Sequence, residues 1–394
     1  MEKILKKYPK DLNYLFVSFL FSSFIFFWGI NFNFLQIRFL IFLLIVPILF
    51  KLDKIFIKKI IKYLIVTCLI LFHFIFQSSS YTLDFFFYVI GFFLLCIIFE
   101  KYKKHFFERL DQIIYIFLIF LLNYLLVSFF SYEDYFIRVS SSCIGCFSIL
   151  REFFLENSHF GMSIIPVIFY LLFISKIKIP IRIVLLFLIF ILSYLNSSIT
   201  LVAGLLILIA CTSFIYWKKK RIFVLFLILM SLINIFNKDI LKEKNKVIDI
   251  FIKKENVNLS SEVYLASLFV AKKALFNKPF GYGFNNYFKA FDEYIEDFKP
   301  FNKEVLILNR KDASNNFSKI ITEFGIFSLF YFYFLVSFFL KKNVDNRLKL
   351  FLIIPLIIQT FIRGVGYFNG GFLLFLIYSF ILWKEKSNFS LNTK

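Results

Sequence analysis

The feature that most constrains this chain is its series of long, nearly uncharged apolar runs. A helix needs about 20 mostly apolar residues to cross the hydrocarbon core of a bilayer. Runs close to this length recur along most of the sequence, without the period-two alternation typical of barrel strands. We predict an all-α protein with about twelve membrane-spanning helices, at Leu12–Ile30, Phe34–Phe50, Ile60–Gln77, Tyr81–Phe99, Ile113–Phe130, Phe160–Ile174, Ile183–Leu195, Leu201–Trp217, Ile222–Phe236, Ser318–Leu340, Leu348–Ile362 and Tyr367–Trp383.

Composition excludes an ordinary soluble enzyme. Hydrophobic residues make up 60% of the 394 residues and charged residues only 18%, whereas soluble domains average about 45–50% and about 25%. The formal net charge of +21 would by itself suggest a nucleic-acid partner, but the apolar content argues against one. The positions of the basic residues therefore matter more than their number.

Those positions indicate a membrane topology. With a cytoplasmic N-terminus, 27 of the 46 Lys and Arg residues fall in cytoplasmic segments and 15 in one long outer segment, Lys238–Lys319. The short outer segments hold only Arg38, Arg138, Arg151 and Arg363. Basic residues are concentrated in the cytoplasmic loops of membrane proteins. We therefore predict an uncleaved first span and two cytoplasmic termini.

This topology divides the chain into three parts. Residues 1–237 form a transmembrane bundle of about nine helices with an outer loop at 131–159, residues 238–317 form a large periplasmic loop, and residues 318–394 hold three spans and a cytoplasmic tail. Within the large loop, helical spacing of apolar residues predicts amphipathic helices at Ser260–Phe276, with Ser260 or Ser261 as N-cap, and at Asn285–Phe298. These helices lie either on the membrane surface or as a lid packed on the spans.

Arginine is enriched on the predicted outer side. Five of the nine arginines lie there: Arg38, Arg138, Arg151, Arg310 and Arg363. A guanidinium presents a planar fork that suits phosphate or carboxylate, which lysine cannot mimic. We predict an outer anion site that uses Arg151, Arg310 and Arg363. The alternative is that these arginines anchor the membrane interface or pair with outer acids such as Glu133.

Glu156 and His159 stand three residues apart just before a predicted span. They share a helix face if the helix extends back that far, and could then act as acid and base or orient a sugar hydroxyl. The alternative is that Asn157 or Ser158 caps the start of the helix.

Cysteine and histidine do not predict a metal site. Cys143 and Cys146 stand three apart in an outer loop, where an oxidising compartment would allow a disulfide. A zinc site would need two more ligands nearby, and the sequence offers none. We interpret the two cysteines as a structural or incidental pair and expect neither a metal nor a cofactor.

Three stretches of the outer segments resemble a known family. They are Lys278-Pro-Phe-Gly281-Tyr-Gly283-Phe-Asn-Asn-Tyr287, then Ser314-Asn315-Asn316-Phe317, then Glu323-Phe324-Gly325-Ile326. In this order they resemble the O-antigen polymerase and O-antigen ligase superfamily of bacterial envelopes. The earlier stretch Phe153–Gly161 is similar to the Glu-Pro-Ser-His segment of many polymerases. Ser314 occupies the position of the loop histidine typical of ligases, which argues against a ligase, and the Glu156/His159 segment favours the polymerase type.

The resemblance implies a metal-independent glycosyltransferase of the bacterial inner membrane. It would polymerise polyprenyl-diphosphate-linked oligosaccharide on the periplasmic face, among membrane lipids and beside a flippase and a chain-length regulator. Arg151, Glu156, His159 and Arg310 would be catalytic, and substrate would be bound by Arg363, Lys278, Gly281, Gly283, Asn315 and Glu323. The two glycines would supply a tight turn whose N–H groups face an anion. A ligase that transfers glycan to lipid A core, a transporter or flippase, and a structural membrane protein remain alternatives.

Overall fold

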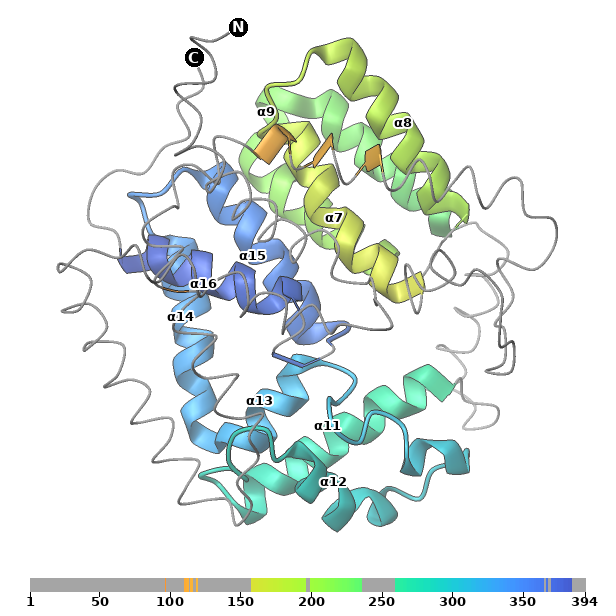
Figure 1. Cartoon of the computed structure of the whole chain (residues 1–394), viewed down its shortest axis with the longest axis vertical. Coiled ribbons are helices and arrows are strands. Elements are labelled where there is room, and N and C mark those ends of the chain that lie inside the picture. Colours follow the sequence, from red (N-terminus) through yellow and green to blue (C-terminus); the bar gives the residue numbers. More distant parts are fainter. Residues whose placement is uncertain are drawn as a thin grey trace, which may run out of the picture. The chain divides into compact units, whose positions relative to one another are not determined.

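The computed structural model describes two long parts of the chain. These are residues 157–235 apart from 196–198, and residues 259–384 apart from 365, 368 and 369, together with Cys96 and several positions between 110 and 119. The predicted spans before residue 96 and the outer loop up to Glu156 lie outside the described residues. All described elements are helical, which confirms the all-α class (Figure 1).

The chain separates into two compact units. The described part of the first unit comprises α7 (Asn157–Phe173), α8 (Ile179–Leu195) and most of α9 (Ile199–Ile235). Its α7–α8 turn is held by Asp111, whose Oδ1 accepts hydrogen bonds from the Tyr170 hydroxyl at 3.0 Å and the Ser175 hydroxyl at 2.9 Å. Arg182 donates to two carbonyls of the same turn.

Helix α9 differs from the prediction of two spans with a break at Lys218–Arg221. It is one helix of 37 residues, about 55 Å long at 1.5 Å per residue. Lysine and arginine are good helix formers, and no Gly or Pro lies between Gly204 and the end of the helix. The basic cluster therefore marks a change of polarity along a helix and does not end it.

The second unit contains the C-terminal part of the large loop and the last three predicted spans. Its described elements are α11 (Leu259–Asn277), α12 (Tyr287–Tyr294), η1 (Ile295–Phe298), η2 (Lys303–Leu306), α13 (Asn316–Phe324), η3 (Gly325–Phe327), α14 (Ser328–Leu340), α15 (Asn346–Phe361) and α16 (Gly370–Lys384). The two predicted amphipathic helices correspond to α11 and to α12 with η1. The predicted N-caps, Ser260 and Ser261, instead lie inside the first turn of α11.

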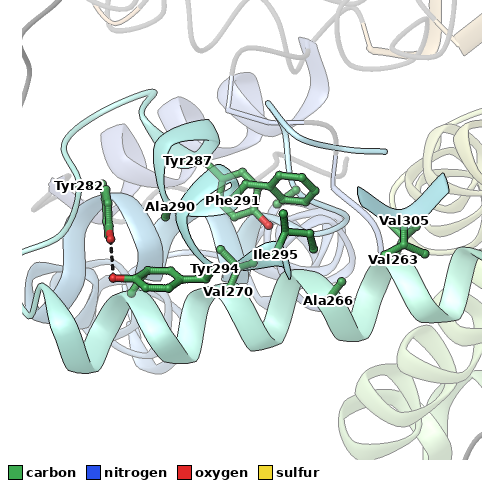
Figure 2. Packing of buried hydrophobic residues seen from close by; sticks show 12 residues of the cluster. Val263, Ala266, Val270, Tyr282, Tyr287, Ala290, Phe291, Tyr294, Ile295 and Val305 are labelled. Carbon is green, nitrogen blue, oxygen red and sulfur yellow. Dashed lines mark hydrogen bonds between the residues drawn. The ribbon is translucent and has the colours of Figure 1, made fainter. Parts of the chain in front are cut away.

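The apolar faces of the loop helices pack on one another. Val270 and Ala274 of α11 are buried against Tyr287, Phe291 and neighbouring side chains of α12 and η1 (Figure 2). An aromatic ring buried in this way removes a large apolar area from water. These faces are therefore occupied by protein, and they are not the surface that would lie on a membrane.

The predicted span Ser318–Leu340 is interrupted. It contains the end of α13, a turn at Gly325 with φ 54° and ψ −130°, and then η3 and α14. Helix α13 packs against α11 and α15, whereas α14 exposes Leu329, Phe330 and Tyr333. Within the described residues, only the stretch Asn316–Leu340 is long and apolar enough to cross a membrane, so the twelve-span arrangement stays a prediction.

Candidate functional site

The three loop motifs of the sequence converge on one place in the second unit, beside the turn between α15 and α16. We call this place the junction and define it as residues 279–287, 314–326 and 363–367. Backbone hydrogen bonds join its first two segments. The Tyr282 N–H donates to the Thr322 carbonyl at 2.9 Å and the Gly283 N–H to the Glu323 carbonyl at 2.9 Å. The Ile326 N–H donates back to the Pro279 carbonyl at 2.8 Å.

Glycine is required where the two segments touch. Gly281 and Gly325 have φ values of 84° and 54°, in the left-handed region that side chains disfavour. A Cβ on Gly281 would lie 2.2 Å from the Glu323 carbonyl oxygen, and one on Gly325 would lie 2.0 Å from the Pro279 oxygen. The glycines therefore allow two backbones to pack directly against each other.

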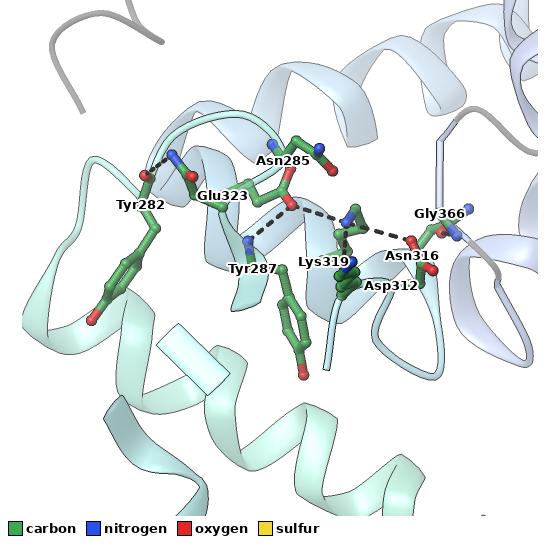
Figure 3. A network of polar contacts seen from close by, with 10 residues as sticks. Tyr282, Asn285, Tyr287, Asp312, Asn316, Lys319, Glu323 and Gly366 are labelled. Atoms are coloured by element: carbon green, nitrogen blue, oxygen red, sulfur yellow. Dashed lines mark hydrogen bonds and ion pairs between the residues drawn. The ribbon is translucent and has the colours of Figure 1, made fainter. Parts of the chain in front are cut away.

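The carboxylate of Glu323 is the anion that the glycine-rich segment holds (Figure 3). Its Oε2 accepts a hydrogen bond from the Asn285 N–H at 2.8 Å and its Oε1 one from the Tyr287 N–H at 3.2 Å. Lys319, one helical turn earlier on α13, places its Nζ 3.2 Å from Oε1. Glu323 is fully buried, so these three donors replace the water that an ionised carboxylate would otherwise need.

Lys319 is buried with Glu323, and sequence reasoning did not single it out. Its side chain is only 2% exposed, and its Nζ donates to the Lys311 carbonyl at 2.6 Å and lies 3.9 Å from a carboxylate oxygen of Asp312. The Nζ also lies 5.4 Å from the ring centroid of Tyr367. The signal that could have found it is a Lys–Glu pair at i, i+4 inside an apolar run.

An aromatic cluster surrounds the buried charges. The ring of Phe284 stacks on Tyr367 with centroids 5.9 Å apart, and Phe324 contacts both rings at 6.1 and 6.2 Å. Phe284 and Tyr367 are each 8% exposed. Exclusion of water by these rings strengthens the electrostatic interaction between Lys319 and Glu323.

The Ser-Asn-Asn motif attaches the α15–α16 turn to α13. Asn315 is the N-cap of α13, because its Oδ1 accepts from the Ser318 N–H at 2.8 Å. The Asn316 Oδ1 accepts from the Gly366 N–H at 3.1 Å, and the Ser314 carbonyl from the Gly364 N–H at 3.0 Å. The half-buried Arg363 stands directly beside this attachment.

The structure thus brings together the predicted residues Gly281, Gly283, Asn315 and Glu323, but it corrects how they were expected to act. The N–H groups predicted to face an external anion are donated to the chain itself: that of Gly281 to the Lys278 carbonyl at 2.8 Å, and that of Gly283 to the Glu323 carbonyl. These residues form a buried scaffold. A substrate would contact the exposed side chains at the edges of this scaffold.

Lys278 stands at one such edge. Its side chain is half-exposed, and its Nζ lies 4.0 Å from the ring centroid of Tyr282 and 3.5 Å from Glu293. The Tyr282 hydroxyl donates to the Glu293 carboxylate at 2.7 Å. That hydrogen bond, more than the nearby Lys278, lowers the pKa of Glu293 below its usual value. Lys278 is therefore held beside a carboxylate that stays ionised near neutral pH.

Arg310 does not point to a free anion site in this structure. Its Nε donates to Asp292 Oδ1 at 2.6 Å, and its second terminal nitrogen pairs with the other oxygen of the same carboxylate. Both side chains are about half exposed. The pair fastens the segment after η2 to α12, and this hydrogen bond raises the pKa of Arg310 further above its ordinary value.

The other predicted catalytic residues belong to the first unit. Arg151 and Glu156 lie outside the described residues, and His159 lies in α7, with its side chain likewise undescribed. Asn157 and Ser158, the alternative caps, are helical. Among the described residues, no group of three or more His, Cys, Asp or Glu side chains could hold a metal ion.

The junction is the most constrained polar structure in the described part of the second unit. It combines four glycines at positive φ, a buried ion pair and three bonded backbone segments. No protein-family model, no curated protein and no solved structure gives a match to this chain.

Proposed function

We propose that this chain is a multi-pass membrane glycosyltransferase that polymerises polyprenyl-diphosphate-linked oligosaccharide on the outer face of the bacterial inner membrane. The observation that carries the proposal is the convergence at the junction. Motifs separated by some forty residues, which resemble those of O-antigen polymerases, contact one another through backbone hydrogen bonds and a shared carboxylate. A site that positions a substrate needs segments fixed to one another in this way.

The proposed reaction needs two kinds of group. An acceptor hydroxyl attacks the anomeric carbon of the donor sugar, the bond to the diphosphate breaks, and the hydroxyl proton passes to a base. Cationic side chains at the membrane surface stabilise the leaving diphosphate. In the second unit, Arg363 and Lys278 at the edges of the junction are the proposed cations. In the first unit, the sequence alone proposes Arg151 as a cation and Glu156 or His159 as a base.

The junction residues have a different role in this proposal. Glu323, Lys319 and Asn315 are buried, so they position the glycine-rich segment and the α15–α16 turn without touching substrate. Lys278 directly precedes the first of these segments, and Arg363 begins the other. Arg310, which pairs with Asp292, is not needed for the step.

Deletion of the gene separates the proposal from its alternatives. A polymerase deletion leaves a single repeat unit on the surface glycolipid, because transfer continues without elongation. Loss of a ligase leaves bare lipid A core and accumulates lipid-linked polymer. Loss of a flippase traps single repeat units on the cytoplasmic leaflet. Long chains in the deletion strain would exclude a polymerase.

Substitutions test the cationic site. Arg363→Lys and Arg151→Lys keep the charge but remove the bidentate fork, so we expect shorter chains at an unchanged protein level. Arg347→Lys is the matched control, because the Arg347 guanidinium is paired at 2.7 Å with Asp345, the N-cap of α15. Wild-type chain lengths in both the Arg363 and Arg151 variants would exclude the proposed site.

A further inference from the structure

The apolar side chains that the second unit leaves exposed between α11 and α14 fall into two groups. One group comprises Phe280, just after the end of α11, and Ile326 and Phe327 in η3, which are 59%, 51% and 43% exposed. The other lies in the segment before and after η2 and comprises Phe301, Ile307 and Leu308. Large exposed apolar patches mark interaction surfaces, and the first group adjoins the exposed face of α14.

The first group is continuous with the exposed face of α14. The rings of Phe280 and Phe327 contact each other with centroids 6.1 Å apart, and Phe327 directly precedes α14. That helix then exposes Leu329 and Phe330 in its first turn. We name Phe280, Ile326 and Phe327 the aromatic shoulder of α14.

The length of α14 indicates what covers the shoulder. Its 13 residues span about 20 Å at 1.5 Å per residue, whereas the hydrocarbon core of a bilayer is about 30 Å thick. Helix α13 does not supply the missing length as a lipid-facing surface, because it buries the charged pair Lys319 and Glu323 within protein. The shoulder extends the apolar surface of α14 beyond the first residue of the helix, and so adds to the length that can lie in the hydrocarbon core.

The polar neighbour of the shoulder has the character expected at a membrane interface. Lys278, two residues before Phe280, lies over the ring of Tyr282 and keeps its ammonium half-exposed. Lysines near the ends of membrane segments extend their ammonium toward the phosphates while their stems cover apolar surface.

We propose that the aromatic shoulder is a membrane anchor, with Phe280, Ile326 and Phe327 inserted beneath the lipid headgroups and Lys278 at the phosphate level. The occupant of this apolar surface is the lipid bilayer itself. The anchor fixes the junction at the membrane surface, at the depth where the diphosphate of a polyprenyl-linked substrate lies. The insertion does not depend on catalysis, so it can be tested apart from the proposed function.

Fluorescence quenching by lipid tests the insertion. Phe280→Trp and Phe327→Trp are each made in the full-length protein with Trp28, Trp217 and Trp383 replaced by phenylalanine, and the protein is placed in phosphatidylcholine nanodiscs brominated high on the acyl chains. We expect at least about a twofold loss of emission relative to unbrominated lipid, as for side chains buried in the headgroup–acyl boundary.

Phe301→Trp is the matched control. Phe301 is also highly exposed, but its N–H donates to Glu262 at the opposite end of α11, so its emission should barely change. Unquenched tryptophans at both 280 and 327 would mean that protein or water covers the shoulder, and would overturn the proposal. Equal quenching at 301 would overturn the assignment of the anchor to the shoulder. Since both shoulder positions are already exposed, two independent variants guard against the misfolding of one.

Discussion

Gly281 and Gly325 lie backbone against backbone, although 44 positions separate them in the sequence. A Cβ built on Gly281 would stand 2.8 Å from the Gly325 nitrogen, and one built on Gly325 would stand 2.6 Å from the Gly281 nitrogen. Real Cβ atoms do not approach backbone this closely. The contact therefore leaves room for a hydrogen atom at each position and for nothing larger.

Alanine at either glycine should loosen the junction. Each substitution combines a positive φ, which costs about 1–3 kcal/mol for a residue other than glycine, with an overlap that forces the two segments apart. We expect a lower midpoint of thermal unfolding in detergent and faster proteolysis of the 279–287 segment. Glu296→Ala, an exposed substitution on η1, is the control. Wild-type midpoints for both glycine variants would contradict the observed packing.

The buried pair Lys319–Glu323 makes a second, sharper prediction. Removing one partner leaves an uncompensated buried charge, which costs about 3–5 kcal/mol. Lys319→Met and Glu323→Gln should therefore each destabilise the protein and reduce polymer length. Lys319→Met/Glu323→Gln removes both charges and should regain much of the stability, since a neutral pair has no such penalty.

Polymer length in that double variant shows what the pair does for function. Recovery of chain length together with stability means that the pair positions the segment, as its burial indicates. If stability returns while chain length does not, one of the two charges takes part in the reaction. Additive losses of stability in a double-mutant cycle would contradict the contact itself.

Local patterns in the sequence were sufficient for the loop helices. Spacing of apolar residues predicted α11 and α12 with η1, because their periodicity reports a buried face and no distant contact is needed to see it. The end of α13 was missed for the opposite reason. The apolar residues on either side of Gly325 read as one continuous span, although Lys319 and Glu323 within it marked a buried polar face.

The internal use of the glycine-rich turn could not be predicted from spacing. A turn with two glycines indicates N–H groups that face an anion, and the sequence does not reveal that the anion is the chain's own Glu323. That assignment depends on contacts across 36 and 38 positions. The same holds for Arg310, since its partner Asp292 lies 18 positions away, on a different element.

Arg310 offers a direct comparison between an ion pair and a substrate site. If Arg310 serves only to pair with Asp292, Arg310→Lys and Asp292→Asn should have the same small effect on stability, because solvent and salt screen exposed ion pairs. Chain length should stay near wild type in both. A strong loss of polymer in Arg310→Lys, with none in Asp292→Asn, would support the catalytic role that the sequence predicts for Arg310.

Because α9 is continuous, the most informative measurement is the side of the membrane on which the large loop lies. If α9 crosses the membrane once, the α7–α8 turn and the large loop lie on the same side. If the helix instead breaks at Lys218–Arg221, so that each apolar half crosses and this cluster lies at the cytoplasmic surface, the turn and the loop lie on opposite sides. We expect the second arrangement, which requires the continuous α9 of the structure to break at its basic cluster in the membrane. Each basic residue at the centre of a bilayer costs about 2.5–3.5 kcal/mol, and the second half is too apolar to remain in water.

Cysteine labelling in spheroplasts decides between these arrangements. The five native cysteines are replaced by serine, and single cysteines are introduced at the exposed positions Lys176, Glu296 and Lys342. A membrane-impermeant maleimide should label position 296 before lysis, and positions 176 and 342 only after lysis. The control is lysis in denaturant, which should make all three reactive. Labelling of positions 176 and 296 together would contradict the two crossings of α9. Labelling of position 296 only after lysis would contradict the outer loop, and with it an enzyme that uses periplasmic substrate.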